Sequence, residues 1–449
     1  MDKARETALK ALYETEVKDA YSNLVLKKLL RDRQLEPRDR AFVTELVYGT
    51  VTRKLTLDWV ISRFSKVKLK KLSNWVLQIL RLGAYQILFL DRVPPSAACN
   101  TSVELAGRYA KQSKGFVNAV LRNIARNRDG IDFQDIDAQS TAERFSIKYS
   151  FPEYLAGEWI TAFGEEFAGT LLESLLERPD FSVRINTLKT TREALVDELG
   201  QNGIEAVPGR FLDEALYLRN VSDISGLDAF IEGKMTVQDE SSMLAVKVLD
   251  PAPGERILDV CAAPGGKTTH IGQVMKNKGH IDAWDIHEHK IGLIGENARR
   301  LGVEIIEASQ RDALRPLEEA KGMYDRVLVD APCSGTGIIR RKPDIKWKRK
   351  KEDFSSLVEI QKKILYNSSM YVKPGGVLVY STCSLDEREN EQIIAGFLSE
   401  NGNFARESLK GRLPGTLNEK EGTEEGILRL YPHIDGTDGF FIARMRRIS

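Results

Sequence analysis

Residues 257–274, ILDVCAAPGGKTTHIGQV, decide how the carboxyl half of this chain folds. The apolar run before Cys261 predicts a buried strand, and the residues after Gly266 predict the start of a helix. Between them, Gly265 and Gly266 allow the backbone to approach a ligand closely, and the following helix presents free N–H groups. The stretch therefore predicts a strand, a glycine turn and a helix. The turn is a weak signal by itself, because many α/β proteins have glycine at this place.

The same order of strand, loop and helix continues along this half of the chain. We expect further strands at residues 279–286, 303–309, 324–332 and 375–383, and helices at residues 290–301 and 354–372. Such alternation indicates a parallel sheet with helices on both faces. In sheets of this kind, ligands bind at the carboxyl ends of the strands. The sequence therefore predicts a Rossmann-like α/β domain with its site at that edge of the sheet.

The rest of the chain predicts two further domains. Apolar residues at three- and four-residue spacing predict helices in residues 4–17, 38–64, 72–90, 93–110 and 114–128. A polar stretch at residues 128–140 has the composition of a linker. After it come a helix at 151–163, a strand at 181–188, a helix at 191–203 and a strand at 214–219. We expect an all-α bundle at residues 1–130, a small α+β (RRM-like) connector at 140–240, and the α/β domain at 241–449.

Acidic residues stand at the ends of three successive predicted strands. Asp285 follows Gly266 by 19 residues, a distance at which a carboxylate can accept hydrogen bonds from ribose hydroxyls. Asp312 is placed to bind an adenine amine, and Asp330 ends the next strand. Each alone could be a helix cap. Three together are hard to explain as caps and indicate a nucleoside ligand.

The turn also separates one kind of nucleoside ligand from another. It lacks both the Walker-type glycine loop and the G-x-G-x-x-G spacing, which disfavours ligands with a pyrophosphate, such as NAD or ATP. S-adenosylmethionine fits better, because it joins an adenosine to a cationic sulfonium and an amino-acid tail. We interpret Cys261, within the turn, as a packing residue. The four cysteines are widely spaced, so we expect free thiols and no metal site.

Two cysteines follow the last two predicted strands. Cys333 lies in VLVDAPCSGTG and Cys383 in VLVYSTCSLDE. If these strands are neighbours, both thiols emerge side by side at the ligand edge of the sheet. Either cysteine alone could be a small buried hydrophobe. Together they suit pyrimidine chemistry: carbon 5 of cytosine is a poor nucleophile, and a thiolate that adds to carbon 6 activates it. Asp330 can hydrogen-bond the ring, and the target base has to be unpaired or flipped out.

At DVCAAPGGKT, DAPCSGTG and STCS the sequence resembles the RNA 5-methylcytosine methyltransferases. SFPEYLAGEW, RINTLK and VQDESSMLA are also similar to that family, and the similarity covers essentially the whole chain. The helical front resembles a NusB-like RNA-binding domain, and this pairing is characteristic of bacterial 16S ribosomal RNA methyltransferases. The resemblance implies a class I methyltransferase that uses S-adenosylmethionine to methylate carbon 5 of a cytosine in 16S ribosomal RNA.

The resemblance also implies roles for particular residues. The acidic cofactor contacts fall on Asp285, Asp312 and Asp330. Cys383 corresponds to the cysteine that attacks the base, and Cys333 to the one implicated in product release; the spacing of the residues does not assign these two roles. The cofactor loop covers Cys261, Ala262, Ala263, Pro264, Gly265, Gly266 and Lys267.

The charge distribution points to a polyanionic partner. The net charge is +1, but residues 1–130 hold 25 Lys and Arg against 13 Asp and Glu. A basic front fits RNA, although a solvated helical surface explains it equally well. Residues 340–351 could hold phosphates around Trp347, unless that residue is in the core. The candidate RNA contacts there are Arg340, Arg341, Lys342, Lys346, Lys348, Arg349, Lys350 and Lys351; weaker ones in the front are Lys111, Lys114, Arg122, Arg126 and Arg128.

Two other functions remain open from the residues. A non-enzymatic RNA-binding or antitermination factor would explain the front but not the acids and cysteines. A nicotinamide-dependent oxidoreductase would share the fold but lacks its glycine pattern. No apolar stretch is long enough to span a bilayer, and the amino terminus lacks the apolar centre of a secretory signal. We therefore expect a cytoplasmic monomer without membrane contact.

Overall fold

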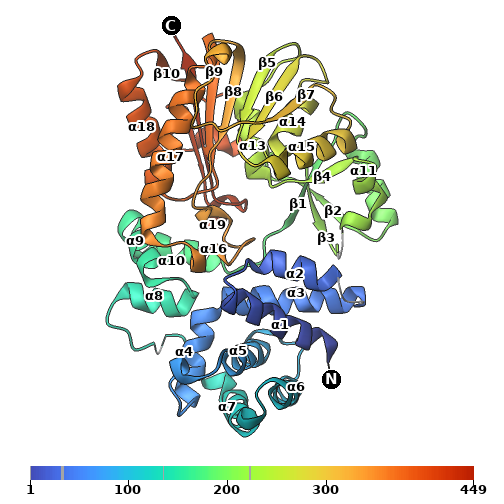
Figure 1. Ribbon diagram of the computed structural model, residues 1–449, viewed down its shortest axis with the longest axis vertical. Helices are drawn as coiled ribbons and strands as arrows, with labels where there is room; N and C mark the ends of the chain where they lie inside the picture. The colour runs from blue at the N-terminus through green and yellow to red at the C-terminus, as the bar shows by residue number, and fades with distance from the viewer. Residues whose placement is uncertain (1, 32–34, 135, 222–223) are drawn as a thin grey trace. The chain divides into compact units, whose positions relative to one another are not determined.

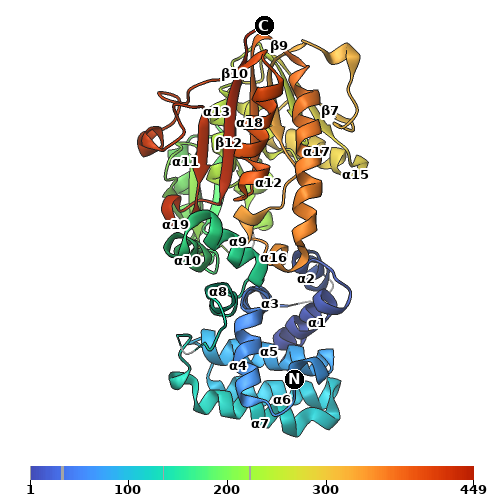
Figure 2. The same ribbon diagram turned by 90° about the vertical axis from the view of Figure 1, so that its left-hand side faces the viewer.

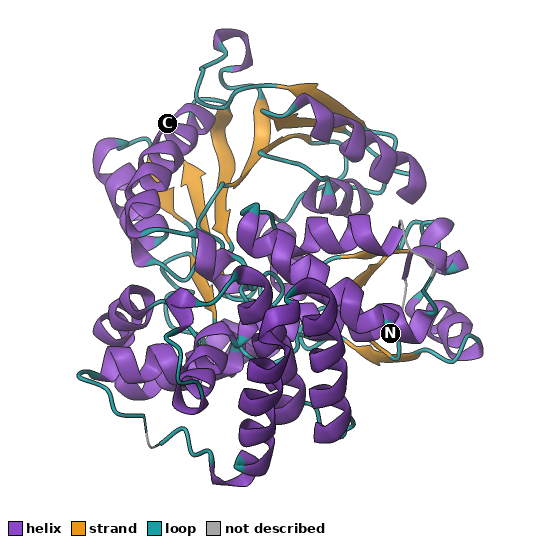
Figure 3. Cartoon of the chain, turned by 60° about the horizontal axis from the view of Figure 1, so that its bottom comes forward, coloured by secondary structure: helices purple, strands orange, loops and turns teal. Residues whose placement is uncertain are grey.

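The computed structural model describes residues 2–31, 35–134, 136–221 and 224–449, in two compact units. The first unit comprises residues 1–178 and 339–348, and the second comprises residues 179–338 and 349–449. Within the described residues the first unit is helical, and the strands belong to the second (Figure 1, Figure 3). No helix in the described part of the chain is both long and apolar enough to cross a membrane.

The predicted helical front is confirmed, with two differences in detail. The pattern at residues 38–64 forms two helices that meet at Arg53, and a further helix, α2, precedes them. Of the predicted linker, residue 135 lies outside the described residues. The helices of this unit are α1 (Lys3–Val17), α2 (Ser22–Arg31), α3 (Pro37–Thr52), α4 (Lys54–Phe64), α5 (Asn74–Phe89), α6 (Pro95–Tyr109), α7 (Lys114–Arg126), α8 (Thr141–Tyr149), α9 (Glu153–Phe163) and α10 (Glu165–Ser174).

Helix α5 is the centre of the helical core. Its sequence is apolar on nearly all sides, and most of its residues are buried. A helix that is hydrophobic all round has to be enclosed by other elements, and α1, α3, α4, α6 and α7 all contact it. It begins at a cap, because the Ser73 side chain accepts a hydrogen bond from the backbone N–H of Val76.

Residues 339–348 belong to the helical unit although they follow the first cysteine loop in the sequence. They include the short helix α16 (Ile345–Lys348). The indole N–H of Trp347 donates to the carbonyl oxygen of Val51 at 2.9 Å, and Lys346 Nζ donates to that of Thr52 at 2.9 Å. Both acceptors lie at the end of α3, where carbonyls have no partner within the helix. The segment therefore completes α3 of the helical unit.

The second unit contains a small antiparallel sheet in the order β2-β3-β1-β4. The predicted strands at 181–188 and 214–219 are its central pair, and two short edge strands were missed. An apolar cluster joins this sheet to α11, which is the predicted helix at 191–203. The bounds are β1 (Phe181–Ile185), α11 (Arg192–Gln201), β2 (Glu205–Pro208), β3 (Ala215–Arg219), α12 (Asp228–Ile231) and β4 (Met235–Val237).

A large sheet of eight strands carries the predicted motifs. Its order is β10-β12-β9-β8-β5-β6-β7, with β11 beside β12. All five predicted strands are present and mutually parallel. The predicted parallel strands are joined by strands that were not predicted, and β12 pairs antiparallel with β9, so the whole sheet is mixed. The strands are β5 (Arg256–Val260), β6 (His280–Asp285), β7 (Ile306–Gln310), β8 (Tyr324–Asp330), β9 (Val372–Thr382), β10 (Phe404–Arg406), β11 (Ile427–Leu430) and β12 (Phe440–Arg447).

Helices cover both faces of the large sheet, as the alternating pattern predicts. Helices α13 (Glu240–Leu249) and α14 (Gly266–Val274) share one apolar cluster with alternate residues of the central strands. Helices α17 (Lys351–Ser369) and α18 (Glu391–Glu400) share another cluster with the intervening residues and lie side by side on the opposite face (Figure 2). Helix α15 (Glu288–Leu301) contacts α14, β6 and β7.

Candidate active site

The turn after β5 has the shape that its glycines predict. Cys261 and Gly265 both have positive φ, 62° and 96°. A side chain at Gly265 would begin 3.2 Å from the Cα atom of Ile294, so only glycine fits without strain. Gly265 is the N-cap of α14, so the first N–H groups of that helix point toward the end of the sheet. This turn can therefore receive an anionic or polar group of a ligand.

Asp285 and Asp312 lie at the neighbouring strand ends. Asp285 is buried; one of its carboxylate oxygens accepts from Ala263 N at 3.3 Å and the other from His287 N at 3.0 Å. The structure thus ties Asp285 to the glycine turn. Asp312 follows β7 and accepts from Leu314 N at 3.0 Å. The two are close along the edge, because the N–H of Arg311 donates to the carbonyl oxygen of Asp285.

Asp330 and Lys267 form an ion pair at the centre of the site. Lys267 Nζ lies 2.7 Å from one carboxylate oxygen of Asp330, and Ser381 Oγ donates to the other at 2.8 Å. Both line a cavity of about 190 Å³ that also reaches Cys383 and Phe440. The turn after β5, the end of β8 and the second cysteine loop therefore meet in one space.

The two cysteine thiols are adjacent, as the prediction from neighbouring strands requires. β8 and β9 are paired, and the Sγ atoms of Cys333 and Cys383 are 3.4 Å apart. The pKa of the Cys333 thiol lies well above its ordinary value, first because of the hydrogen bond to Cys383 and then because of burial. Cys333 therefore retains its proton and can donate it in a hydrogen bond to the Cys383 sulfur.

Cys261 is held as a neutral thiol. Burial raises its pKa, and the nearby carboxylates of Asp330, Asp285 and Asp259 raise it further. It also packs against the apolar cluster beneath α17. Because a thiol is nucleophilic only as the thiolate, these facts support the interpretation of Cys261 as a packing residue.

Asp259 is a site residue that the sequence analysis missed. It lies within β5, is fully buried, and accepts a hydrogen bond from Thr268 Oγ1 at 2.6 Å. Burial raises its pKa to about 7, and the charges of Asp330 and Asp285 add to the shift. An acid inside an apolar strand was the available signal, because such a group is costly to bury unless it is paired or neutral.

Arg184 is a second missed residue, located in the RINTLK stretch of the small sheet. It is fully buried, and burial lowers its pKa to about 9. Its guanidinium donates to the carbonyl oxygen of Gly266 at 2.8 Å and to Thr269 Oγ1 at 3.1 Å. Arg184 therefore fixes the first turn of α14 from outside the Rossmann-like sheet.

The predicted RNA contacts around Trp347 need correction. Trp347 and Lys346 form the hydrogen bonds to α3 described above, and Lys346 is fully buried. Lys348 pairs with Asp19, while Arg349 donates to the carbonyl oxygens of Ser334 and Cys333. These side chains bond to groups inside the protein, and Trp347 packs, partly buried, against the helical core, as the alternative interpretation held for that residue. The exposed cations of the stretch are Lys342, Lys350 and Lys351.

On the helical unit, basic residues line an open hollow. Lys114 and Arg122 of α7 face it together with Asn118, and Asn100 and Glu104 of α6 complete its rim. Lys111 and Arg126 are also exposed. Of the basic candidates in the front domain, these four are exposed, whereas Arg128 is partly buried and pairs with Asp91 at 2.9 Å.

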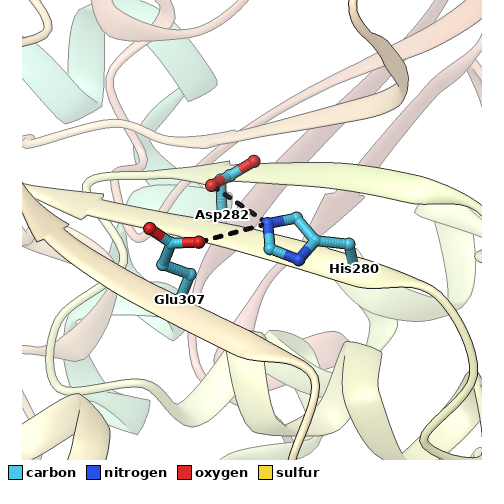
Figure 4. A group of neighbouring side chains, drawn as sticks. All are labelled: His280, Asp282 and Glu307. Atoms are coloured by element: carbon cyan, nitrogen blue, oxygen red, sulfur yellow. Dashed lines mark ion pairs between the residues drawn. The ribbon is translucent and has the colours of Figure 1, made fainter.

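A further polar group lies at the opposite end of the large sheet. Figure 4 shows His280 and Asp282 of β6 beside Glu307 of β7, with His280 Nε2 3.2 Å from Asp282 and 3.8 Å from Glu307. These atoms are close enough together to hold a metal ion. Arg256 already pairs with Asp282 at 3.1 Å, however, so ion pairs account for this group. β6 runs from His280 to Asp285, which separates the group from the cysteine loops.

The adjacent thiols, the acidic strand ends and the turn after β5 are the chemistry of a methyltransferase that works on a pyrimidine of RNA with S-adenosylmethionine. Family comparisons agree for each part of the chain. Residues 246–446 match the family described as 16S rRNA methyltransferase RsmB/F, residues 2–126 match the NusB family, and residues 151–225 match the ferredoxin-like domain of RsmF/B-like methyltransferases.

Relatives match over nearly the full length. The probable ribosomal RNA small subunit methyltransferase B of Bacillus subtilis is 42% identical, with 99% of this chain and 98% of the relative covered. The corresponding methyltransferase of Pectobacterium atrosepticum is 36% identical, with 93% and 92% covered. The chain therefore belongs to the RsmB family of 16S ribosomal RNA cytosine-5 methyltransferases, which use S-adenosylmethionine and a covalent cysteine intermediate.

Solved structures support the same assignment. The crystal structure of PH0851 covers 100% of this chain and 99% of its own, at 28% identity and a TM-score of 0.83. NSun6 from Pyrococcus horikoshii, solved with the S-adenosylmethionine analogue SFG, covers 67% of this chain and 99% of its own, at 25% identity and a TM-score of 0.58. Family membership excludes both alternatives, the non-enzymatic RNA-binding factor and the nicotinamide-dependent oxidoreductase.

Proposed function

We propose that Cys383 is the nucleophile that adds to carbon 6 of the target cytosine. The observation that carries this assignment is the shared cavity, because Cys383 faces the same space as Lys267 and Asp330. The S–H of Cys333 lies 3.4 Å away and stabilises a thiolate at Cys383. Formation of the sulfur–carbon bond moves electron density to carbon 5, which is then able to accept a methyl group.

Cys333 serves in the release of the product. After methylation, carbon 5 carries both the methyl group and its original proton. As the bond between Cys383 and carbon 6 breaks, Cys333 gives its proton to the departing sulfur, and the Cys333 thiolate so formed accepts the proton of carbon 5, which restores the ring. The Cys333 sulfur lies 3.4 Å from the departing sulfur, within reach for this proton transfer.

Asp330 orients the pyrimidine. Its carboxylate is fixed by Lys267 and Ser381, yet each oxygen retains a further lone pair that can accept a hydrogen bond. A hydrogen bond from the protonated or polarised ring draws electron density away from carbon 6, which favours addition of the thiolate. Because the ion pair with Lys267 is already formed, this arrangement is preorganised before the base enters.

S-adenosylmethionine, when bound, supplies an electrophilic methyl group. The turn Cys261–Lys267 fits its amino-acid tail, because the amino end of α14 presents N–H groups that suit a carboxylate. Asp285 suits a ribose diol, and Asp312 suits an adenine amine. The cofactor set is therefore Cys261, Ala262, Ala263, Pro264, Gly265, Gly266, Lys267, Asp285, Asp312 and Asp330.

The substrate cytosine is unpaired or flipped out of a helix. The thiolate has to reach carbon 6 and the methyl donor carbon 5, and a base stacked within a helix does not expose them. The chain divides by role into a helical RNA-binding domain at 1–130, a connector at 140–240 and a catalytic domain at 241–449. The hollow at Lys114 and Arg122 offers phosphate contacts on the helical unit. We expect the enzyme to act as a cytoplasmic monomer.

Replacement of the nucleophile tests the main assignment. Cys383→Ala should abolish transfer of labelled methyl groups to 16S ribosomal RNA, while calorimetry shows S-adenosylmethionine bound with nearly unchanged affinity. Cys99→Ala is the matched control, because Cys99 is buried in the helical core and should leave turnover intact. Residual turnover by Cys383→Ala would remove Cys383 from the reaction.

The release role makes a separate prediction. In Cys333→Ala the covalent bond to RNA should form but break slowly, so a protein–RNA adduct of reduced mobility accumulates on a denaturing gel. The adduct should disappear in the double variant that also lacks Cys383. If Cys333→Ala releases methylated RNA as quickly as the unaltered enzyme, the release step does not involve this thiol.

A further inference from the structure

Glu389 is a fully buried carboxylate directly beside the catalytic loops. It lies in the short helix η7 (Glu387–Glu389), between the second cysteine loop and α18. The proposed chemistry makes no use of it. A buried carboxylate is costly unless its oxygens accept hydrogen bonds, so its partners show what it does.

Four hydrogen bonds to the Glu389 carboxyl group are present among the described residues. Three come from the two cysteine loops, and the fourth comes from Gln361, which itself bonds to the first of these loops. One oxygen accepts from the backbone N–H of Ser334 at 2.8 Å and from Gln361 Nε2 at 2.9 Å. The other accepts from the hydroxyl groups of Ser334 and Ser384. Gln361 in turn donates to the carbonyl oxygen of Pro332 at 2.9 Å.

The two serines are the residues that directly follow the two cysteines. Ser334 comes after Cys333, and Ser384 comes after Cys383. The Glu389 carboxylate therefore binds both loops at the residue next to each cysteine. The two loops begin at the ends of different strands and have 49 residues between their cysteines. A single side chain that accepts hydrogen bonds from both loops fixes their separation.

We propose that Glu389 is a positioning residue whose carboxylate, through Ser334 and Ser384, holds the Cys333 and Cys383 sulfurs at the separation that turnover needs. The inference rests on the proposed roles of the two cysteines. Glu389 does not reach the cavity that Cys383 lines, so its effect on the reaction passes through the loops.

The loops should stay folded without this carboxylate. The N–H of Gly337 donates to the carbonyl oxygen of Cys383 at 2.9 Å, and Leu385 N donates to Thr336 Oγ1 at 2.9 Å. These bonds join the same two loops and do not involve Glu389. Loss of Glu389 should therefore loosen the thiol pair rather than unfold the site.

The test measures the separation of the thiols without RNA. Diamide accepts two electrons and two protons from Cys333 and Cys383, which then form a disulfide, while diamide becomes the hydrazine. The rate of this step reports how often the two sulfurs meet, and free thiols are counted after quenching. The variants are Glu389→Ala, Glu389→Gln, and Glu387→Ala as a control on the exposed side of the same helical turn.

We expect Glu389→Ala to slow disulfide formation about tenfold and to lower kcat by about 100-fold, the scale of effect known for a small misplacement of reacting groups. The affinity for S-adenosylmethionine should stay unchanged. Glu389→Gln keeps one acceptor oxygen and the side-chain length, so it should restore most of both rates. Glu387→Ala should resemble the unaltered enzyme.

Disulfide formation at the normal rate in Glu389→Ala would overturn the proposal. An equal reduction of the disulfide rate and of kcat in Glu389→Gln and Glu389→Ala would also overturn it. If Glu389→Ala fails to fold, the double variant Ser334→Ala/Ser384→Ala provides the same comparison, since it removes both hydroxyl donors and leaves the carboxylate in place. The thiol measurement needs neither RNA nor cofactor, so it does not depend on the proposed catalytic roles. Those roles would be contradicted by a different result, namely turnover by Cys383→Ala.

Discussion

At the scale of single residues, buried acids shape the active site as much as the cysteines do. Asp259 and Glu389 are both fully buried, yet their carboxyl oxygens accept different numbers of hydrogen bonds. Glu389 accepts four hydrogen bonds, whereas only one oxygen of Asp259 has a partner among the described residues. An oxygen without a donor favours the protonated form of Asp259, in agreement with its raised pKa.

Asp259 should make stability depend on pH. Its pKa rises from 3.8 in the unfolded chain to about 7 in the folded protein, so the folded state binds the proton more tightly. The resulting stabilisation is complete below pH 3.8 and is lost as the pH rises through about 7. Relative to Asp259→Asn, the free energy of unfolding should fall by about 2 to 3 kcal/mol between about pH 5 and pH 7.5, as measured by denaturant titration.

Asp325→Asn provides the control for this measurement. Burial acts to raise the pKa of Asp325, but hydrogen bonds from Lys373 and from the backbone of Arg256 outweigh it and leave the pKa below its usual value. A lowered pKa gives stability that is lost only in acid. The free energy of unfolding should therefore depend on pH in the same way for Asp325→Asn and for the unaltered enzyme over this range. A flat difference for Asp259→Asn as well would mean that Asp259 is ionised in the folded state.

The reactive residues at the ends of strands could be predicted from the sequence, whereas the buried acids that support them could not. Cys333, Cys383 and the acids at strand ends could be located because strand order determines which loops meet. Asp259 was hidden because it sits inside an apolar strand. Glu389 lies in the charged run DEREN, which has the composition of a solvated surface, and only the folded chain shows that it turns inward.

At the scale of elements, the turn between β5 and α14 is the most constrained segment of the site. Gly265 has a φ of +96° and a neighbouring backbone atom 3.2 Å from the position of a Cβ atom. Gly254 has almost the same φ, +94°, but open space around it. The two glycines therefore allow the cost of backbone strain to be separated from the cost of crowding.

Gly265→Ala should impair cofactor binding, whereas Gly254→Ala should not. Both variants should lose about 1 to 2 kcal/mol of stability, because both force an L-residue into the left-handed region. Only Gly265→Ala has to shift the turn away from Ile294, which moves the first N–H groups of α14. Calorimetry with S-adenosylmethionine and thermal unfolding of both variants measure the two effects. Equal affinities would show that the turn tolerates a side chain.

Elements with a clear hydrophobic pattern were identified, and several elements without one were missed. The parallel strands are apolar runs bounded by turns, which makes them visible in the sequence. β2 and β4 are short edge strands of the small sheet and carry little pattern. β12 was missed because IARMRR alternates apolar with basic residues at the end of the chain, and its partner β9 was already assigned to a parallel pair.

At the scale of the whole molecule, the chain visits the helical unit twice. Residues 339–348 return to it after the first cysteine loop, and Trp347 packs against its core. Sequence reasoning interpreted this stretch as a basic RNA contact because its composition is basic. Its true partners, the carbonyl oxygens of Val51 and Thr52, lie almost three hundred residues earlier, a separation that local patterns do not report.

Trp347→Ala should therefore destabilise the helical unit. The change removes an aromatic side chain from an apolar cluster and leaves the carbonyl oxygen of Val51 without its donor, at a cost of about 2 to 4 kcal/mol. Hydrogen exchange of the amides in α3 and α4 measures the loss locally. Lys342→Ala, an exposed change in the same stretch, should leave exchange unaltered. Unchanged protection in Trp347→Ala would show that the segment is not part of that core.

The return of residues 339–348 to the helical unit limits how this enzyme can be cut or recombined. A truncation after residue 178 would deprive the front of the peptide that completes α3. The complementary fragment would keep a tryptophan and a lysine that are enclosed in the intact protein. An exchange of the amino-terminal module between relatives should therefore succeed only if the matching decapeptide, residues 339–348, is exchanged with it.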